Sequence, residues 1–332
     1  MAKNILIICG AGASFDYSNY AHPSILTNDL VNTNFINKPE ISSIISKYPD
    51  MAGIFSEIST PVIENKQTFE SSLQKIMDGV GDKKHRKEQF ISLEFFLKDT
   101  FEWVSKQSNP INNYQALITK IKDYNEGKAS VITFNYDSLL EQSITDEKYV
   151  DINHYLSNNI QIIKPHGSHD WAYMSDKNNL DYQWEGCITD CDYYKKHPEY
   201  LSQLRQIGAH PYHTNQLKNH SNLAIFPAIA VPLSNKDTFV CPERHTLQIK
   251  TVLKNADKIL IIGWKAGDKI LVDLIEKNIN KQVPVTIVTE KKESSEEVAS
   301  NLRHIKNLNF RLVNSGFSGF ISSDEINVFF KE

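Results

Sequence analysis

Short apolar runs, each followed at once by glycine or small polar residues, are the feature that most constrains the fold of this chain. They lie at residues 4–9, 129–134, 159–163, 258–262 and 283–288. Runs of this length that are apolar on both faces are typical of buried strands in a parallel sheet. Helical patterns lie between several of them, so the sequence predicts an α/β fold with a doubly wound, Rossmann-like parallel sheet.

Two regions interrupt this alternation and divide the chain. Residues 31–128 carry apolar side chains at helical spacing, so we predict a helical insertion there. Residues 170–223 are rich in Tyr, His, Asp and Asn without a clear period, and we predict an irregular insertion or small subdomain. The Rossmann-like domain is then formed by residues 1–30 and 129–332.

Helix-capping residues predict where several helices begin. Asn109 followed by Pro110 is typical of a helix start, and Asp268 is a good N-cap for the helix after the run at 258–262. Ser294 with Glu297 predicts a capping box for a later helix.

Composition excludes several classes of protein. The net charge is −4 and 23% of the residues are charged, so no direct nucleic-acid binding is expected. The four cysteines do not form two CxxC pairs, and we expect no metal. The apolar run near the N-terminus is far too short for a signal peptide or a membrane span, so we predict a cytoplasmic protein without a membrane segment.

Suggestive polar clusters follow the predicted strands. They occupy residues 10–14, 135–137, 166–168, 263–268 and 289–290. In an open parallel sheet, ligands bind beyond the carboxyl ends of the strands. The shared position of these clusters therefore predicts a single site at the carboxyl ends of the strands.

The first and last clusters offer groups for a nucleotide. Gly10 and Gly12 would let backbone N–H groups approach a phosphate, although the GxGxxG pattern is incomplete and a simple tight turn is the alternative. Glu290 could accept both hydroxyls of an adenosine ribose. The alternative for Glu290 is a solvated acid beside Lys291 and Lys292.

The middle clusters offer groups for catalysis. His166 follows a predicted buried strand between Pro165 and Gly167, and an ordinary histidine pKa suits a general base at neutral pH. Asn135 is its proposed partner at the end of another strand. Asp137 either supports the site or caps the helix that follows.

These motifs resemble those of the sirtuin-like superfamily. Gly10-Ala11-Gly12-Ala13-Ser14, Thr133-Phe134-Asn135-Tyr136-Asp137, Lys164-Pro165-His166-Gly167-Ser168 and Ile261-Ile262-Gly263-Trp264 occur in the family's order. The pattern looks most similar to prokaryotic sirtuin-like proteins that consume NAD as effectors of antiphage defence.

The resemblance implies a role for each matching residue. It places Gly10, Ala11, Gly12 and Ser14 around the NAD phosphates, and Asn135 at the nicotinamide ribose or the attacking water with Asp137 and Gly167 nearby. It makes His166 the base. Gly263, Trp264 and Glu290 would lie near the adenosine half, although Lys265-Ala266-Gly267-Asp268 is unusual for the effectors.

Departures from the deacetylating sirtuins favour hydrolysis. The paired zinc cysteines and the Gly-Ile-Pro-Asp-Phe-Arg segment of those enzymes are absent, and Ala230-Val231-Pro232-Leu233-Ser234 lacks the expected substrate-pairing sequence. We therefore expect an NAD+ glycohydrolase (NADase). The alternatives are an NAD-dependent protein deacylase or ADP-ribosyltransferase, and a non-catalytic NAD or ADP-ribose sensor subunit. A Rossmann oxidoreductase is disfavoured by the incomplete glycine motif.

A defence effector needs control of its activity. The resemblance therefore implies a homo-oligomer or a separately encoded partner, such as a motor ATPase. The sequence itself identifies neither the partner nor the trigger.

Overall fold

A six-stranded parallel sheet forms the centre of the computed structural model, which describes residues 3–17, 26–81, 83–144, 147–174, 187–188, 191–196, 211–217, 223–234 and 238–331. From one edge to the other, the strands are β3 (Ile160–Ile163), β2 (Ala129–Thr133), β1 (Ile5–Cys9), β8 (Lys258–Ile262), β9 (Val283–Val288) and β10 (Leu308–Val313). Strands β2 and β3 are thus added on one side of β1, and the later strands β8, β9 and β10 are added on its other side. This is the Rossmann strand order, with its reversal between β1 and β8, and it confirms the predicted fold class.

Alternating side chains of the strands feed two hydrophobic cores. In β1, Ile5, Ile7 and Cys9 join the core on one face, whereas Leu6 and Ile8 join the core on the other. Because side chains alternate across a strand, a strand that is apolar at every position must be covered on both faces.

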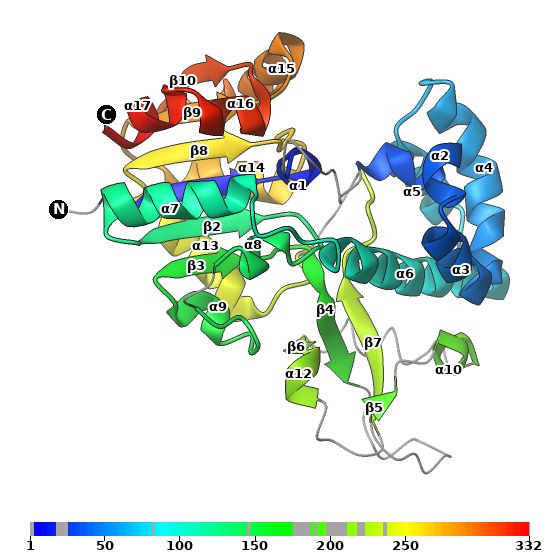
Figure 1. Ribbon diagram of the computed structural model, residues 1–332. Helices are drawn as coiled ribbons and strands as arrows, with labels where there is room; N and C mark the ends of the chain where they lie inside the picture. Colours follow the sequence, from blue (N-terminus) through cyan, green and yellow to red (C-terminus); the bar gives the residue numbers. More distant parts are fainter. Residues whose placement is uncertain are drawn as a thin grey trace.

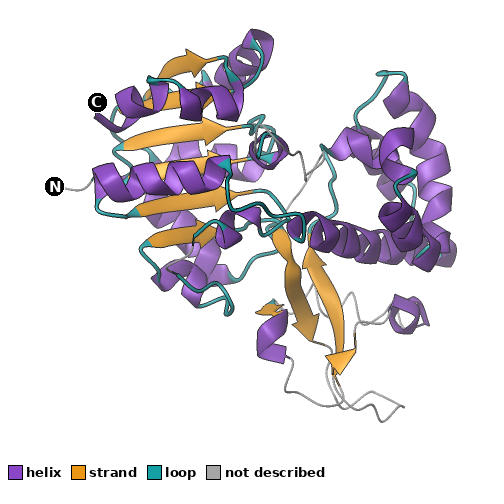
Figure 2. Cartoon of the chain, viewed as in Figure 1, coloured by secondary structure: helices purple, strands orange, loops and turns teal. Residues whose placement is uncertain are grey.

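Helices supply those covers, as Figures 1 and 2 show. The first core takes side chains from α7 (Asn113–Asn125), α16 (Gly316–Ser322) and α17 (Glu325–Lys331). The second takes them from α13 (Glu243–Asn255), α14 (Lys269–Asn278) and α15 (Lys292–Leu302). None of the described helices is both long and apolar enough to cross a membrane.

A helical lobe lies beyond the carboxyl ends of the strands, on the right of Figure 1. It contains η1 (Thr27–Val31), α2 (Thr33–Ile36), α3 (Pro39–Lys47), η2 (Pro49–Met51), α4 (Ala52–Ile63), α5 (Phe69–Asp78) and the long α6 (Lys84–Ser105). Phe95 and Phe96 of α6 are fully buried in the first core. Most of these helices lie in residues 31–128, the segment for which the sequence predicts a helical insertion.

A second, mostly antiparallel sheet follows β3. It has the order β5 (Cys187–Ile188), β7 (Leu223–Ile229), β4 (Gly167–Met174) and β6 (Tyr212–His213), with the short helices α10 (Cys191–Lys196) and α12 (Thr214–Leu217) beside it. Strand β4 was not predicted, because the consecutive polar residues Ser168, His169 and Asp170 fill its first half and no apolar period is visible there. Most of the predicted insertion at 170–223 lies outside the described residues.

Two of the predicted helix starts are wrong. Helix α7 begins at Asn113, because Asn112 rather than Asn109 accepts the capping hydrogen bond, from Gln115 N. Helix α15 already begins at Lys292, so Ser294 lies inside it and forms no capping box. The predicted cap at Asp268 is confirmed: its Oδ1 accepts a 2.9 Å hydrogen bond from Leu271 N.

Candidate active site

The loops after β1 and β8 touch backbone to backbone at the point where the strand order reverses. Gly10 N donates to Ile262 O (3.0 Å) and Gly12 N donates to Gly263 O (3.2 Å). A Cβ on Gly10 would lie 2.5 Å from Gly263 O, and Gly263 itself has a φ of +60°. Only glycine permits this approach. The contact therefore places the Gly10–Ser14 cluster beside the start of the 263–268 cluster.

Backbone hydrogen bonds occupy some of the N–H groups that were expected to bind a phosphate. Gly12 N–H is bonded to Gly263 O, and Ala13 N–H donates to Gly10 O (2.9 Å). Within the part of the chain that the structure describes, Ala11 N–H has no protein acceptor. The short helix α1 (Ala11–Phe15) thus offers fewer amides than the glycine motif alone implies.

Four buried side chains form a hydrogen-bonded cluster next to this loop. Asn135 Nδ2 donates to Ser14 Oγ (2.9 Å) and to Tyr114 Oη (3.3 Å). Ser14 Oγ lies 3.0 Å from Tyr114 Oη and donates to Asp137 Oδ1 (3.1 Å). The structure therefore brings together Ser14, Asn135 and Asp137, which were predicted to share one site, and adds Tyr114 from α7.

The direction of these hydrogen bonds follows from counting hydrogens. Ser14 has one hydroxyl hydrogen and gives it to Asp137, so Tyr114 must donate to Ser14. Both amide hydrogens of Asn135 then point into the cluster. The carbonyl oxygen of Asn135 accepts no hydrogen bond from the described residues and remains available to accept one from a ligand.

Residues 134–137 alternate between two partners. Asn135 and Asp137 contact Ser14, whereas Phe134 and Tyr136 contact the ring of His166. The ring centroid of Phe134 lies 4.7 Å from that of His166 in an edge arrangement, and that of Tyr136 lies at 6.4 Å. One short segment thus links the two predicted catalytic residues.

His166 lies between the two sheets and is paired with an acid. Its Nε2 lies 2.8 Å from Asp268 Oδ2, and both side chains are more than 90% buried. The next residue, Gly167, begins β4 with a φ of +76°, where a Cβ would collide with Ala228 O. The sequence predicted Asp268 only as a helix cap, because capping alone explains an aspartate directly before a helix.

A buried ion pair holds the backbone of this cluster at Asp137. Lys164 Nζ, with a fully buried side chain, donates to Asp137 O (2.6 Å) and to Glu141 Oε1 (2.8 Å). Burial raises the pKa of both Asp137 and Glu141, and the charge of Lys164 opposes that rise. The link fixes the loop after β2 to the end of β3.

His169 is a second histidine near the site. Its Nε2 lies 3.2 Å from Ser138 Oγ, and burial lowers its pKa to about 4. So low a pKa makes His169 a weak base, which counts against it as the proton acceptor of the site.

Trp264 and Glu290, two of the three residues expected at the adenosine half, differ in exposure. Trp264 is buried and its ring stacks on Phe134 with a centroid distance of 5.6 Å and an interplanar angle of 4°. Glu290 follows β9 and is exposed, so its carboxylate is accessible. Trp264 thus packs on Phe134, which itself contacts His166, whereas Glu290 is open to a ligand.

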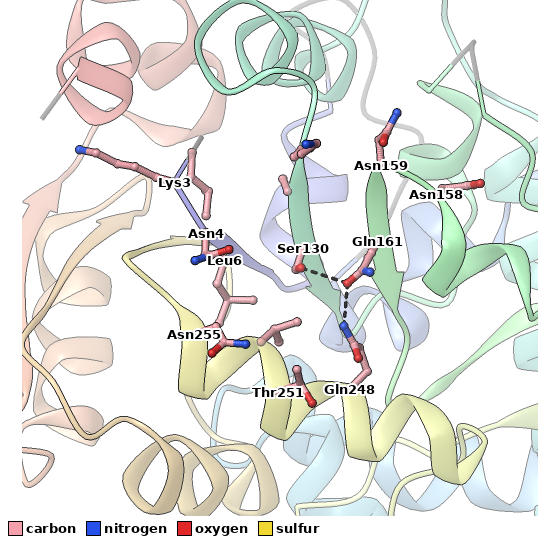
Figure 3. A pocket seen from close by; sticks show the side chains of 14 residues that line it. Lys3, Asn4, Leu6, Ser130, Asn158, Asn159, Gln161, Gln248, Thr251 and Asn255 are labelled. Carbon is pink, nitrogen blue, oxygen red and sulfur yellow. Dashed lines mark hydrogen bonds between the residues drawn. The ribbon is translucent and has the colours of Figure 1, made fainter. Parts of the chain in front are cut away.

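A cavity of about 310 Å³ lies at the amino ends of the strands (Figure 3). It is lined by the amino ends of β1 and β2 and by α13, with Gln161 bonded to Ser130 and Gln248 at its floor. The predicted site residues instead lie at the carboxyl ends of the strands. No cluster of three or more potential metal ligands occurs among the residues with described positions.

Comparison with known proteins shows a distant similarity to Sir2 structures. No protein-family model matches the sequence, and no curated protein does. The structure of Sir2Tm with a propionylated peptide covers 99% of this chain and 94% of its own, at 12% identity and a TM-score of 0.45. A Sir2 homologue in complex with NAD covers 99% and 90%, at 10% identity and a TM-score of 0.42. The fold assignment rests on the strand order described above.

Proposed function

We propose that this protein is an NAD+ glycohydrolase, which cleaves the nicotinamide–ribose bond to give nicotinamide and ADP-ribose. The observation that carries the proposal is the orientation of Asn135: its amide hydrogens are bound by Ser14 and Tyr114, so its carbonyl oxygen is presented as an acceptor. It is presented at the edge of a Rossmann-ordered sheet, where dinucleotides bind.

The chemistry requires few protein groups. Nicotinamide in NAD+ leaves as a neutral molecule, so no general acid is needed. Asn135 would orient the attacking water or a ribose hydroxyl through its carbonyl oxygen, and His166 would accept the proton. Fixed dipoles around the ribose would stabilise the oxocarbenium-like transition state.

Recognition of the rest of the dinucleotide is assigned to the loops after β1, β8 and β9. Ala11 N–H is available for a phosphate oxygen, and Gly10, Gly12 and Gly263 bring the backbone of both loops together. Glu290 would accept the hydroxyls of the adenosine ribose. Its exposed carboxylate makes Glu290→Gln a substitution that should raise KM and leave the fold unchanged.

The biological role that we propose is depletion of NAD in antiphage defence, by analogy with the proteins whose motifs this chain resembles. Control by self-association or by a separately encoded partner, such as a motor ATPase, belongs to the same proposal.

The test is NAD+ consumption by the purified protein, followed by HPLC, with His166→Ala and Asn135→Ala in parallel. Release of nicotinamide and ADP-ribose by the wild type, lost in both variants at unchanged folding, supports the proposal. Turnover retained in both variants would contradict the assignment of these residues.

The same assay separates the alternatives. A deacylase or ADP-ribosyltransferase would release nicotinamide only when an acceptor protein is added. A sensor would bind NAD or ADP-ribose in a stoichiometric complex without releasing nicotinamide.

A further inference from the structure

We infer that Asp268 is a positioning residue for His166, holding the imidazole in the one tautomer that can act as the base. The inference rests on the proposed function for its catalytic meaning, but the contact itself can be tested in the protein without substrate.

Both oxygens of the Asp268 carboxylate are bound. Oδ1 accepts from Leu271 N at 2.9 Å, and Oδ2 lies 2.8 Å from His166 Nε2. The first bond fixes the carboxylate at the start of α14, so the second is made from a rigid element. Strands β1 and β2 lie between the two strands that carry these residues, so the pair spans the floor of the candidate site.

The plane of the His166 ring is fixed independently. Phe134 and Tyr136 contact the ring, and the Tyr136 hydroxyl is tethered to Ala230 O at 2.7 Å. Ala230 N in turn donates to the carbonyl oxygen of His166 at 2.8 Å. Stacking restricts where the ring lies but does not decide which nitrogen carries the hydrogen, and Asp268 supplies that choice.

The chemistry follows from the hydrogen count. An ionised carboxylate only accepts hydrogen bonds, so Nε2 of His166 must carry a hydrogen. In a neutral imidazole Nδ1 then carries the lone pair, and under the proposed function Nδ1 would take the proton released when water adds to the ribose carbon and nicotinamide leaves. The carboxylate remains ionised and stabilises the imidazolium that forms.

Two substitutions separate positioning from helix capping. Asp268→Ser keeps a good N-cap, but its hydroxyl is one bond shorter and leaves His166 without the carboxylate. Asp268→Asn keeps the size and the cap and removes the charge. Asp273→Ser, in the same helix but outside the site, is the matched control.

The first readout is the tautomer of His166, from imidazole ¹⁵N chemical shifts of the unliganded protein. We expect the Nε2–H form in the wild type and in Asp273→Ser, and a mixture of both tautomers in Asp268→Ser. An Nδ1–H wild type, or an unchanged tautomer in Asp268→Ser, would overturn the inference.

The second readout is NAD+ cleavage. We expect kcat to fall about tenfold or more in Asp268→Ser and Asp268→Asn, with KM nearly unchanged and the thermal midpoint close to that of the wild type. Faster cleavage in either variant would mean that Asp268 blocks the base, and would overturn the inference. If the purified wild type cleaves no NAD+, only the activity of the unaided protein is contradicted, and the tautomer measurement still decides the role of Asp268.

Discussion

The amide nitrogen of Asn135 lies 2.9 Å from the hydroxyl oxygen of Ser14, and this contact determines which end of the amide faces the candidate site. Ser14 can accept from Asn135 because its own hydrogen is given to Asp137. The serine of the glycine motif therefore acts on the predicted catalytic asparagine, a role distinct from the phosphate contact that the resemblance implies.

Removing the Tyr114 hydroxyl should weaken this orientation. In Tyr114→Phe, Asn135 loses one acceptor and Ser14 loses one donor. A hydrogen bond worth about 1 kcal/mol corresponds to a roughly fivefold lower kcat. Ser14→Ala removes more contacts and should cost at least as much. Steady-state NAD+ cleavage measures both.

The control for this experiment is Tyr17→Phe. Tyr17 packs against Tyr114 with ring centroids 6.0 Å apart, but its hydroxyl bonds to Asn109 O, away from Asn135. Equal losses of kcat in Tyr17→Phe and Tyr114→Phe would show that packing, and not the hydroxyl, is responsible.

Gly263→Ala should destabilise the protein by roughly 2 to 4 kcal/mol, because it combines an unfavourable φ with a collision. The new Cβ would lie 2.5 Å from Ala13 N and from Gly12 C. Gly81 also has a positive φ, of +49°, but a Cβ there would meet nothing within 4 Å. Gly81→Ala should therefore cost only about 1 kcal/mol, and denaturant unfolding of both variants checks the difference.

Breaking the buried pair of Lys164 and Glu141 on one side should cost about 3 to 5 kcal/mol, because the remaining charge stays buried. The double variant Lys164→Met with Glu141→Leu should recover much of this loss. The exposed pair of Lys292 and Glu296 provides the control, since Lys292→Met should cost less than about 1 kcal/mol. A double variant as unstable as the singles would contradict the expectation.

His245→Leu should reduce the acid sensitivity of folding. His245 is fully buried, and burial lowers its pKa to about 3, helped by the nearby charge of Arg244. Below pH 6.5 the unfolded chain therefore binds a proton that the folded protein does not, so stability falls as the pH falls toward 3.

The wild type should lose about 1.5 kcal/mol more than His245→Leu between pH 6.5 and pH 5. Urea unfolding at the two pH values gives the difference directly, because His169 and the buried carboxyl groups are common to both proteins. An equal loss in the two proteins would show that His245 does not titrate in this range.

The strands of the parallel sheet were largely predictable because burial on both faces leaves a continuous apolar run. Strands β8 and β9 have the predicted boundaries. Strand β10 was missed because only Leu308 and Val313 of its six residues are buried. Strand β4 was missed because the second sheet buries polar residues such as His169, whose partners come from elsewhere in the chain.

The polar clusters at strand ends were visible in the sequence, but their internal geometry was not. Asn135 and Ser14 are 121 residues apart, and His166 and Asp268 are 102 apart. Tyr114 lies in the segment 31–128, where apolar side chains recur at helical spacing and predict only a helix. No local pattern reveals that its hydroxyl ends in the site, because this depends on how α7 lies on the sheet.

His166 stands where the two sheets meet, with β3 ending at Ile163 and β4 beginning at Gly167. The imidazole is therefore attached to both layers at once, without a flexible linker to absorb a shift of either. A shift of the antiparallel sheet relative to the parallel one would therefore displace the backbone of His166. Under the function that we propose, the second sheet would then influence the rate of NAD+ cleavage through the position of His166.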